Sequence, residues 1–262
     1  MFCENRLQGK LALITGATSG IGRSCAEKLA QMGVNLIITG RRANILDEIK
    51  KELEEKFNIK VCLLQLDARS PKEVDEKIDS LSNEWKNIDI LINNAGLALG
   101  LDKVYNNSVE DIDAMIDTNV KGMLYMIRKI VPSMVARDLP ALVVNIGSVA
   151  GDAAYAGGAV YCASKAAVKS LSDGLRIDLV DTKVKVTNIK PGLVETNFSV
   201  IRFKGDEERA GNVYKGIEAL TPDDIADTVV YICNLPDNVQ IPEITMTPMF
   251  QASGTVLHRS NN

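Results

Sequence analysis

Tyr161 and Lys165 stand four residues apart in the stretch "YCASK", and Ser148 lies thirteen residues before Tyr161. Residues four apart on a helix share one face, so the phenol and the ammonium can point into one cleft. A free tyrosine has a pKa of about 10, and a neighbouring ammonium lowers that pKa by favouring the phenolate. A phenol tuned in this way gives a proton to a carbonyl oxygen or takes one from an alcohol. The spacing therefore predicts acid–base chemistry between a carbonyl compound and its alcohol.

Three further polar residues complete this hypothesis. Ser148 is expected to follow a strand and to donate a hydrogen bond to the same substrate oxygen. Asn119, in "DTNVKG", is placed to hold water and Lys165 in a relay, and Tyr155, with Ala159 four residues later, is assigned to the pocket wall. A tyrosine–lysine pair alone is more often an exposed helix pair, so the catalytic interpretation depends on its combination with Ser148 and a nucleotide-binding turn.

Histidine and cysteine offer little other chemistry. The single histidine, His258, lies near the C-terminal end, which excludes a Ser-His-Asp triad or a multi-histidine metal site unless that end folds back. We therefore predict no metal site. The five cysteines are scattered without a CxxC pair and are expected to be reduced thiols of a cytoplasmic protein: Cys3, Cys25, Cys62, Cys162 and Cys233.

The composition narrows the class of partner. Apolar residues make up 46% and charged residues 24% of 262 residues, which is ordinary for a chain with a sizeable core. The net charge is −4 and no dense Lys/Arg block occurs, so we expect no nucleic-acid or membrane partner. The apolar stretches are shorter than the roughly 18 residues of a spanning helix, and the polar N-terminus lacks a signal-peptide pattern.

Seven apolar bursts alternate with longer amphipathic stretches. Most bursts are apolar at nearly every position, which indicates strands covered on both faces. The predicted strands are 10–15, 34–39, 60–66, 88–93, 141–146, 184–189 and 242–247. The predicted helices are 22–32, 44–56, 71–85, 109–137, 161–180 and 222–235, with Ser70, Ser108 and Thr221 placed as N-caps.

Regular strand–helix alternation predicts the α/β class, with a single doubly wound parallel sheet of about seven strands and helices on both faces, a Rossmann-like fold. No repeat or linker divides the chain, so we expect one dinucleotide-binding and catalytic domain over residues 1–262. Ligands of such a sheet bind beyond the carboxyl ends of the strands. The charged, irregular segment 194–219 is either a plain loop or a substrate lid.

A glycine-rich turn, "TGATSGIG", joins the first predicted strand to a helix. Its glycines permit a tight turn that brings backbone N–H groups to a pyrophosphate at the helix N-terminus. A purely structural turn is the alternative, and the position between a strand and a helix argues against it. The predicted cofactor-binding residues here are Gly16, Ala17, Thr18, Ser19, Gly20, Ile21 and Gly22.

The end of the second predicted strand indicates the type of dinucleotide. NAD sites usually carry an acidic residue there, whereas this chain has Arg41 and Arg42. A guanidinium pairs with a 2′-phosphate through charge-assisted bonds, so we predict NADP(H) over NAD. Arginines merely solvated at a helix start are the alternative, although a helix N-terminus disfavours cations. Asp67, followed by Ala68, is placed to accept from the adenine amino group, or else to cap the next turn.

The motifs "TGATSGIG", "NNAG", "DTNVKG", "NIGSVAG", "YCASK" and "PGLVET", in this order, resemble the short-chain dehydrogenase/reductase family over nearly the entire chain. The resemblance implies a catalytic tetrad of Asn119, Ser148, Tyr161 and Lys165, with Tyr161 and Lys165 also binding the nicotinamide ribose side. It further implies cofactor contacts from Asn94, Ala95 and Gly96 on the adenosine side and from Pro191, Gly192, Val194 and Thr196 along the nicotinamide. Members are often homotetramers or homodimers.

A narrower resemblance, carried by "NNAGLALG" and "PGLVETNFSVIRFKGDEERA", is to the NADP-dependent 3-hydroxy acid dehydrogenase branch, which includes serine and L-allo-threonine dehydrogenases and malonic semialdehyde reductases. A carboxylate-bearing substrate needs a cationic partner, and Arg202 and Lys204 are the candidates. Solvated lid charges are the alternative. Two other functions stay open: a carbonyl or 3-oxoacyl thioester reductase with a large apolar pocket, and a catalytically silent NADP-sensing protein.

Overall fold

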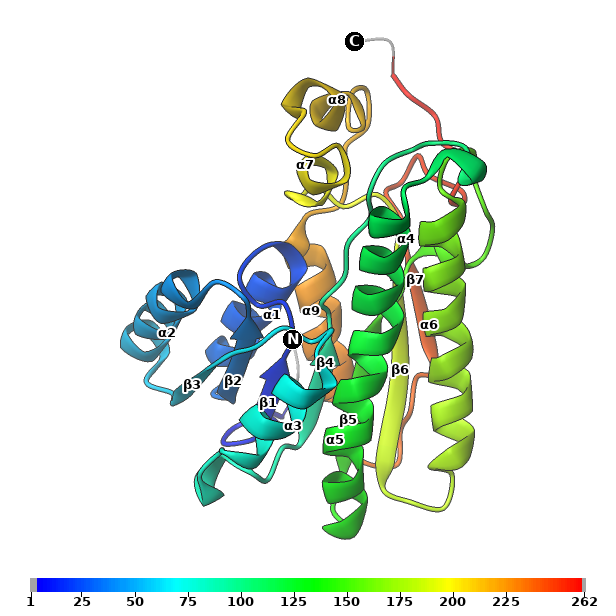
Figure 1. Ribbon diagram of the computed structural model, residues 1–262. Coiled ribbons are helices and arrows are strands. Elements are labelled where there is room, and N and C mark those ends of the chain that lie inside the picture. Colours follow the sequence, from blue (N-terminus) through cyan, green and yellow to red (C-terminus); the bar gives the residue numbers. More distant parts are fainter. Residues whose placement is uncertain (1–3, 261–262) are drawn as a thin grey trace.

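The computed structural model describes residues 4–260 of the chain. Within these residues seven parallel strands form one sheet in the order β3-β2-β1-β4-β5-β6-β7, with helices on both faces (Figure 1). The predicted doubly wound, Rossmann-like α/β fold is therefore confirmed. The strands are β1 (Leu11–Ile14), β2 (Asn35–Gly40), β3 (Val61–Gln65), β4 (Ile90–Asn93), β5 (Ala141–Ile146), β6 (Val184–Pro191) and β7 (Glu243–Met246).

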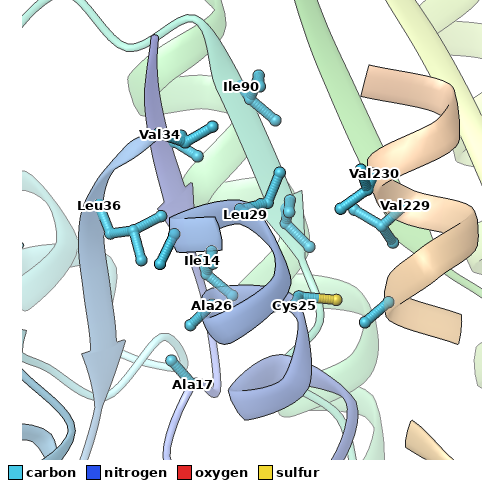
Figure 2. Close-up of a cluster of buried hydrophobic side chains, with 14 of the residues drawn as sticks. Ile14, Ala17, Cys25, Ala26, Leu29, Val34, Leu36, Ile90, Val229 and Val230 are labelled. Carbon is cyan, nitrogen blue, oxygen red and sulfur yellow. The ribbon is translucent and has the colours of Figure 1, made fainter. Parts of the chain in front are cut away.

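The core lies in two layers, one on each face of the sheet. Successive strand residues point to opposite faces, so Ala12 and Ile14 pack in one layer while Leu11 and Leu13 pack in the other. This double coverage is why most of the strands are apolar at nearly every position. Figure 2 shows part of the first layer, where Leu29 of α1 faces the strands beside the side chains of α9.

The helices begin where the sequence supplies capping side chains. The Ser70 and Ser108 hydroxyls accept from the backbone N–H groups of Glu73 and Asp111, and Thr221 forms a capping box with Asp224, so all three predicted caps are confirmed. The long helices are α1 (Gly20–Gln31), α2 (Ala43–Phe57), α3 (Pro71–Asp79), α4 (Val109–Ile116), α5 (Met123–Ala136), α6 (Ala159–Asp178) and α9 (Pro222–Cys233). Short 3₁₀ turns are η1 (Asn83–Trp85), η2 (Val104–Asn106) and η4 (Val149–Gly151).

Two predicted helices differ from the structure. The helix predicted over 71–85 ends at Asp79, where Ser80 caps it and the serine- and asparagine-rich stretch that follows disfavours helix. The helix predicted over 109–137 is interrupted by the π-helical segment η3 (Asp117–Gly122) between α4 and α5. A π turn holds one more residue than an α turn and is common at functional sites. This one contains Asn119.

The segment predicted to be irregular, 194–219, contains two short helices, α7 (Phe198–Arg202) and α8 (Glu207–Asn212). Figure 1 shows them together above the end of the sheet at which β6 finishes. No helix among residues 4–260 combines the length and the apolar character that crossing a membrane requires.

Candidate active site

A cavity of about 1040 Å³ lies at the carboxyl ends of the strands, where the strand order reverses between β1 and β4. It brings together most of the predicted site residues from distant parts of the chain. Those lining it are Gly16, Thr18, Ser19, Gly20, Ile21, Arg41, Arg42, Asp67, Ala68, Asn94, Ala95, Gly96, Ser148, Tyr155, Tyr161, Lys165, Pro191, Gly192, Val194, Thr196 and Arg202. Ala17, Gly22, Asn119 and Lys204 do not line it.

The glycine-rich turn has the backbone geometry expected of a phosphate cradle. Gly16 and Gly20 adopt φ values of +67° and +53°, a region that side chains disfavour. A Cβ at Gly22 would lie 2.4 Å from Asn94 Nδ2 and 2.5 Å from the Gly16 carbonyl oxygen, so only glycine fits there. Ala17 is fully buried, with its N–H donating to the Thr39 carbonyl. Gly22 and Ala17 therefore support the turn on the side that faces away from the cavity.

Asn94 fixes this turn to the end of β4. Its Nδ2 donates to the Thr15 carbonyl at 2.9 Å and to the Gly16 carbonyl at 3.2 Å. The Thr15 hydroxyl in turn accepts from the backbone N–H groups of Asn94 and Ala95, each at 3.0 Å. The first and fourth strand ends are thus joined by side chains, which makes the cradle rigid.

The residues at the ends of β2 and β3 supply positive charge. Arg42 Nη2 donates to the Thr18 hydroxyl at 2.7 Å, which holds this guanidinium against the glycine-rich turn. Asp67 binds Arg69, with Nε donating to both carboxylate oxygens at 3.0 Å, and that ion pair lowers the pKa of Asp67. Asp67 also accepts from the Arg69 backbone N–H, so it caps the turn as well as lining the cavity. Arg69 was not predicted and lines the same region.

Tyr161 and Lys165 lie on the first turns of α6, and Ser148 follows β5 as the N-cap of η4. The Lys165 ammonium donates to the Ile146 carbonyl at 2.8 Å and lies 5.9 Å from the centroid of the Tyr161 ring. Burial lowers the pKa of Lys165 to about 8. The predicted juxtaposition of a phenol, an ammonium and a hydroxyl is present.

The direction predicted for the pKa of Tyr161 is wrong in this arrangement. Burial raises it to about 12, and the nearby Tyr155 phenol adds to the increase. The Arg202 guanidinium and the hydrogen bond with Ser148 act in the opposite direction. The reason is that desolvation of the phenolate outweighs the attraction of the neighbouring positive charges.

Asn119 is anchored by hydrogen bonds to Leu97 and Ser164, and its predicted relay with water and Lys165 stays a prediction. Its Oδ1 accepts from the Leu97 N–H and its Nδ2 donates to the Leu97 carbonyl, both at 2.8 Å. The same Nδ2 donates to the Ser164 hydroxyl at 2.9 Å, one residue before Lys165. The Asn119 side chain is 2% exposed and does not reach the cavity, so it joins the segment after β4 to α6. The π turn at η3 positions it for this contact.

Arg202 and Lys204, the two candidates for binding a carboxylate, point to different places. Arg202 Nη2 donates to the Tyr155 hydroxyl at 2.6 Å, and its guanidinium carbon lies 5.0 Å from the centroid of the Tyr161 ring. Lys204 instead pairs with Asp111 at 2.8 Å and does not line the cavity. The assignment of Lys204 is therefore wrong, because the chain turns at this residue with φ of +53° after α7 has ended.

Several lining residues were not predicted from the sequence; they come from the loop after β4, from α7 and the loop that follows it, and from the C-terminal segment. The Tyr214 hydroxyl pairs with Ser199 Oγ at 2.7 Å. Gln251 Oε1 accepts from the Leu193 N–H at 2.8 Å, and Arg259 donates to the Val213 carbonyl at 3.0 Å. The C-terminal segment thus packs on its own chain, a long-range contact with no local signal. The missed lining residues include Leu101, Phe198, Ser199, Tyr214, Gln251, Leu257 and Arg259.

The described cysteines, Cys25, Cys62, Cys162 and Cys233, are free thiols, and Cys3 lies outside the described residues. Within residues 4–260 no group of three or more His, Cys, Asp or Glu side chains is arranged to hold a metal ion.

Comparison with known proteins places this geometry in context. Residues 10–206 match the model of the short chain dehydrogenase family. The NADP-dependent 3-hydroxy acid dehydrogenase of Schizosaccharomyces pombe is 43% identical over 256 residues, 97% of this chain and 98% of that protein. The NADP-dependent 3-hydroxy acid dehydrogenase YdfG of Salmonella typhi is 47% identical over 252 residues, 95% of this chain and 100% of that protein. A solved closed form of serine dehydrogenase complexed with NADP+ has a TM-score of 0.88 and 44% identity, covering 95% of this chain and 100% of that one.

Proposed function

Because the chain belongs to the short chain dehydrogenase family, we propose that it exchanges a hydride between NADP and a small 3-hydroxy acid. It is an NADP-dependent oxidoreductase that acts on CH–OH groups. The proposed substrates are serine, L-allo-threonine or 3-hydroxypropionate and its semialdehyde. The single observation that carries the substrate proposal is the Arg202 guanidinium beside Tyr161 in the cavity.

Tyr161 is the proposed proton carrier. In the oxidative direction its phenolate takes the proton of the substrate hydroxyl, and in the reductive direction its phenol returns a proton to the carbonyl oxygen. Ser148 orients that oxygen by a hydrogen bond. Lys165 is a cation below its pKa of about 8 and favours the phenolate. NADP supplies the hydride chemistry when bound, and the glycine-rich turn and Arg42 have the shape and charge to hold it.

The surroundings of Arg202 favour an anionic substrate. Among residues 4–260 the Arg202 side chain has one hydrogen-bond partner, the Tyr155 hydroxyl, and it pairs with no carboxylate. Its Nε is buried and lacks a hydrogen-bond partner among these residues. Arg202 is partly buried, and a partly buried guanidinium that pairs with no carboxylate of the described residues favours a bound anion such as a substrate carboxylate.

We expect Arg202→Ala to raise the KM for L-serine by about 10- to 100-fold, the range of a charge-assisted hydrogen bond. L-Serine methyl ester lacks the carboxylate, so its kcat/KM should change much less and the discrimination between acid and ester should be lost. Lys204→Ala is the matched control, because Lys204 lies on the same segment but pairs with Asp111 outside the cavity. An unchanged acid-to-ester ratio for Arg202→Ala would remove the assignment.

The substrate itself is tested by following NADPH formation with L-serine, L-allo-threonine and 3-hydroxypropionate. Turnover of at least one of these acids is expected. Activity with none of them, together with activity on a bulky ketone or a 3-oxoacyl thioester, would replace the substrate proposal with the reductase alternative. The silent-sensor alternative requires bound NADPH without any turnover.

Arg42 is proposed to bind the 2′-phosphate that distinguishes NADP from NAD. We expect Arg42→Ala to raise the KM for NADP by about 10- to 100-fold while the KM for NAD changes little, because only NADP carries the additional charge. Initial rates with both cofactors provide the measurement. Arg23→Ala is the control, since Arg23 is exposed on α1 and pairs with Glu52 at 2.8 Å. Equal loss of affinity for both cofactors would contradict the proposed role.

Three further expectations remain proposals. Residues 1–262 are proposed to act as one domain in which segment 194–219, with α7 and α8, is a substrate lid; Phe198, Ser199 and Arg202 of that segment line the cavity. The structure is of a single chain, and assembly into a homotetramer or homodimer stays a prediction. A cytoplasmic location agrees with the free thiols of Cys25, Cys62, Cys162 and Cys233.

A further inference from the structure

Of the two cations that the described part of the chain places over the Tyr161 ring, Arg202 is the nearer. Its guanidinium carbon lies 5.0 Å from the ring centroid, compared with 5.9 Å for the Lys165 ammonium. The two cations reach the ring from different elements, Arg202 from the end of α7 and Lys165 from α6. A positive charge within about 4–6 Å of a phenol favours the phenolate, whichever residue carries it.

The guanidinium is held in this place by several independent contacts. Three aromatic rings surround it, with the Tyr155 and Phe198 centroids at 5.7 and 5.4 Å in addition to that of Tyr161. The Tyr155 hydroxyl accepts from Nη2 at 2.6 Å, and the Arg202 carbonyl accepts from the Gly100 N–H at 2.9 Å. Arg202 is the last residue of α7, so the position of the charge depends on the position of α7.

We propose that Arg202 is a second activating cation, which α7 delivers to Tyr161 and which stabilises the phenolate together with Lys165. Because a substrate that binds Arg202 draws α7 over the cavity, substrate binding and activation of the proton carrier become one event. Stabilisation of the phenolate by Arg202 goes beyond the proposed binding of a substrate carboxylate and does not depend on it; only the coupling to substrate binding rests on that contact. Tyr155, which fixes the guanidinium, is a positioning residue in this scheme.

The other ionisable groups around Tyr161 do not take the place of Arg202 in stabilising its phenolate. Tyr155 and Cys162 are acids, and their ionised forms would oppose the phenolate, as their influence on the pKa of Tyr161 shows. The Lys165 ammonium already donates a hydrogen bond to the Ile146 carbonyl at 2.8 Å. Arg202 is the group of opposite charge that lowers the pKa of Tyr161 against the effect of burial.

The pH dependence of NADP reduction in Arg202→Met and Arg202→Lys tests this proposal. The substrate is 1,3-propanediol, which has no titratable group and no carboxylate to offset the guanidinium. In the oxidative direction the rate rises as the base ionises, so removal of a stabilising cation moves the midpoint of this rise to higher pH. We expect Arg202→Met to move the midpoint of kcat upward by about one pH unit, and Arg202→Lys to retain most of the wild-type value.

Lys204→Met is the matched control, since it removes a lid cation that pairs with Asp111 outside the cavity, and its profile should coincide with the wild type. A profile for Arg202→Met that keeps the wild-type midpoint at a lower rate would overturn the proposal, as would an equal movement in Lys204→Met. The proposed contact between Arg202 and a substrate carboxylate is tested separately, by the ratio of kcat/KM for L-serine to kcat/KM for its methyl ester. A moved midpoint with an unchanged ratio would leave this inference standing and remove the proposed substrate contact.

Discussion

Tyr161→Phe is expected to lower kcat for NADP-linked oxidation by about 1,000-fold, within the range that acid–base groups contribute. The substitution removes one oxygen and keeps the ring that packs against Phe198, with centroids 5.6 Å apart. The other phenol that lines the cavity among the described residues, Tyr155, accepts a hydrogen bond from Arg202, and we expect it not to replace the lost proton carrier. Hydride exchange therefore loses its proton acceptor while the cofactor cradle stays intact.

Two measurements make this result specific. Binding of NADPH, followed by its fluorescence, should change by no more than a few-fold in Tyr161→Phe, because the glycine-rich turn is untouched. Tyr105→Phe is the chemically identical control at a tyrosine that is 75% exposed and does not line the cavity, and it should keep wild-type rates. Hydride exchange at an undiminished rate in Tyr161→Phe would show that another group carries the proton.

The fold was predictable because its signal is local. Strands covered on both faces must be apolar at nearly every position, and all seven predicted bursts contain the observed strands or overlap them within a few residues. The π segment at 117–122 escaped prediction, since one additional residue in a helical turn hardly alters the apolar periodicity. This π-helical segment matters for the site because it sets the direction of the Asn119 side chain.

The site was predictable where sequence spacing fixes geometry. Tyr161 and Lys165 share a face because they lie four residues apart on one helix, and the glycine-rich turn follows directly from β1. Arg202 and Lys204 could not be separated in advance, because the end of α7 and its packing against Gly100 decide which of them enters the cavity. Gln251 and Arg259 reach the cavity only through contacts across the fold.

The predicted direction of the Tyr161 pKa failed for a related reason. A sequence shows which charges are available, but the cost of removing a phenolate from water depends on burial by the whole fold. Here burial raises the pKa of Tyr161 to about 12, although two cations lie near the ring. The opposing contribution of Arg202 gains importance from this, because each cation near the ring favours the phenolate that proton transfer requires.

Lys165→Met is expected to lower kcat about 100-fold and to stabilise the protein at neutral pH. The loss of activity follows because Tyr161 loses a cation that favours its phenolate. The gain in stability follows from burial of the ammonium, which is 6% exposed as a residue and has its pKa lowered from 10.5 to about 8. That shift corresponds to a folding cost on the order of 3 kcal/mol, partly offset by the hydrogen bond to Ile146 that the variant loses.

The stability expected to be gained in Lys165→Met depends on pH. Below pH 8 lysine is protonated in both the folded and the unfolded chain, so the wild type carries the full cost of burial. Between pH 8 and 10.5 the unfolded chain binds more protons than the folded one, and the cost declines until it disappears above 10.5. The melting temperature of Lys165→Met, measured without NADP, should exceed that of the wild type by about 5 °C at pH 7 and by progressively less as the pH rises.

Lys190→Met is the control with the opposite sign. Lys190 is buried to a similar extent, but its ammonium lies 2.9 Å from an Asp152 oxygen and 2.6 Å from a Glu243 oxygen. Its removal leaves two carboxylates without their cation, so the same substitution should lower the melting temperature. A destabilised Lys165→Met would mean that its ammonium is as well compensated as that of Lys190. The melting temperature is therefore expected to rise in Lys165→Met and to fall in Lys190→Met. This difference would show that the Lys165 charge serves catalysis at a cost in stability, whereas the Lys190 charge stabilises the fold.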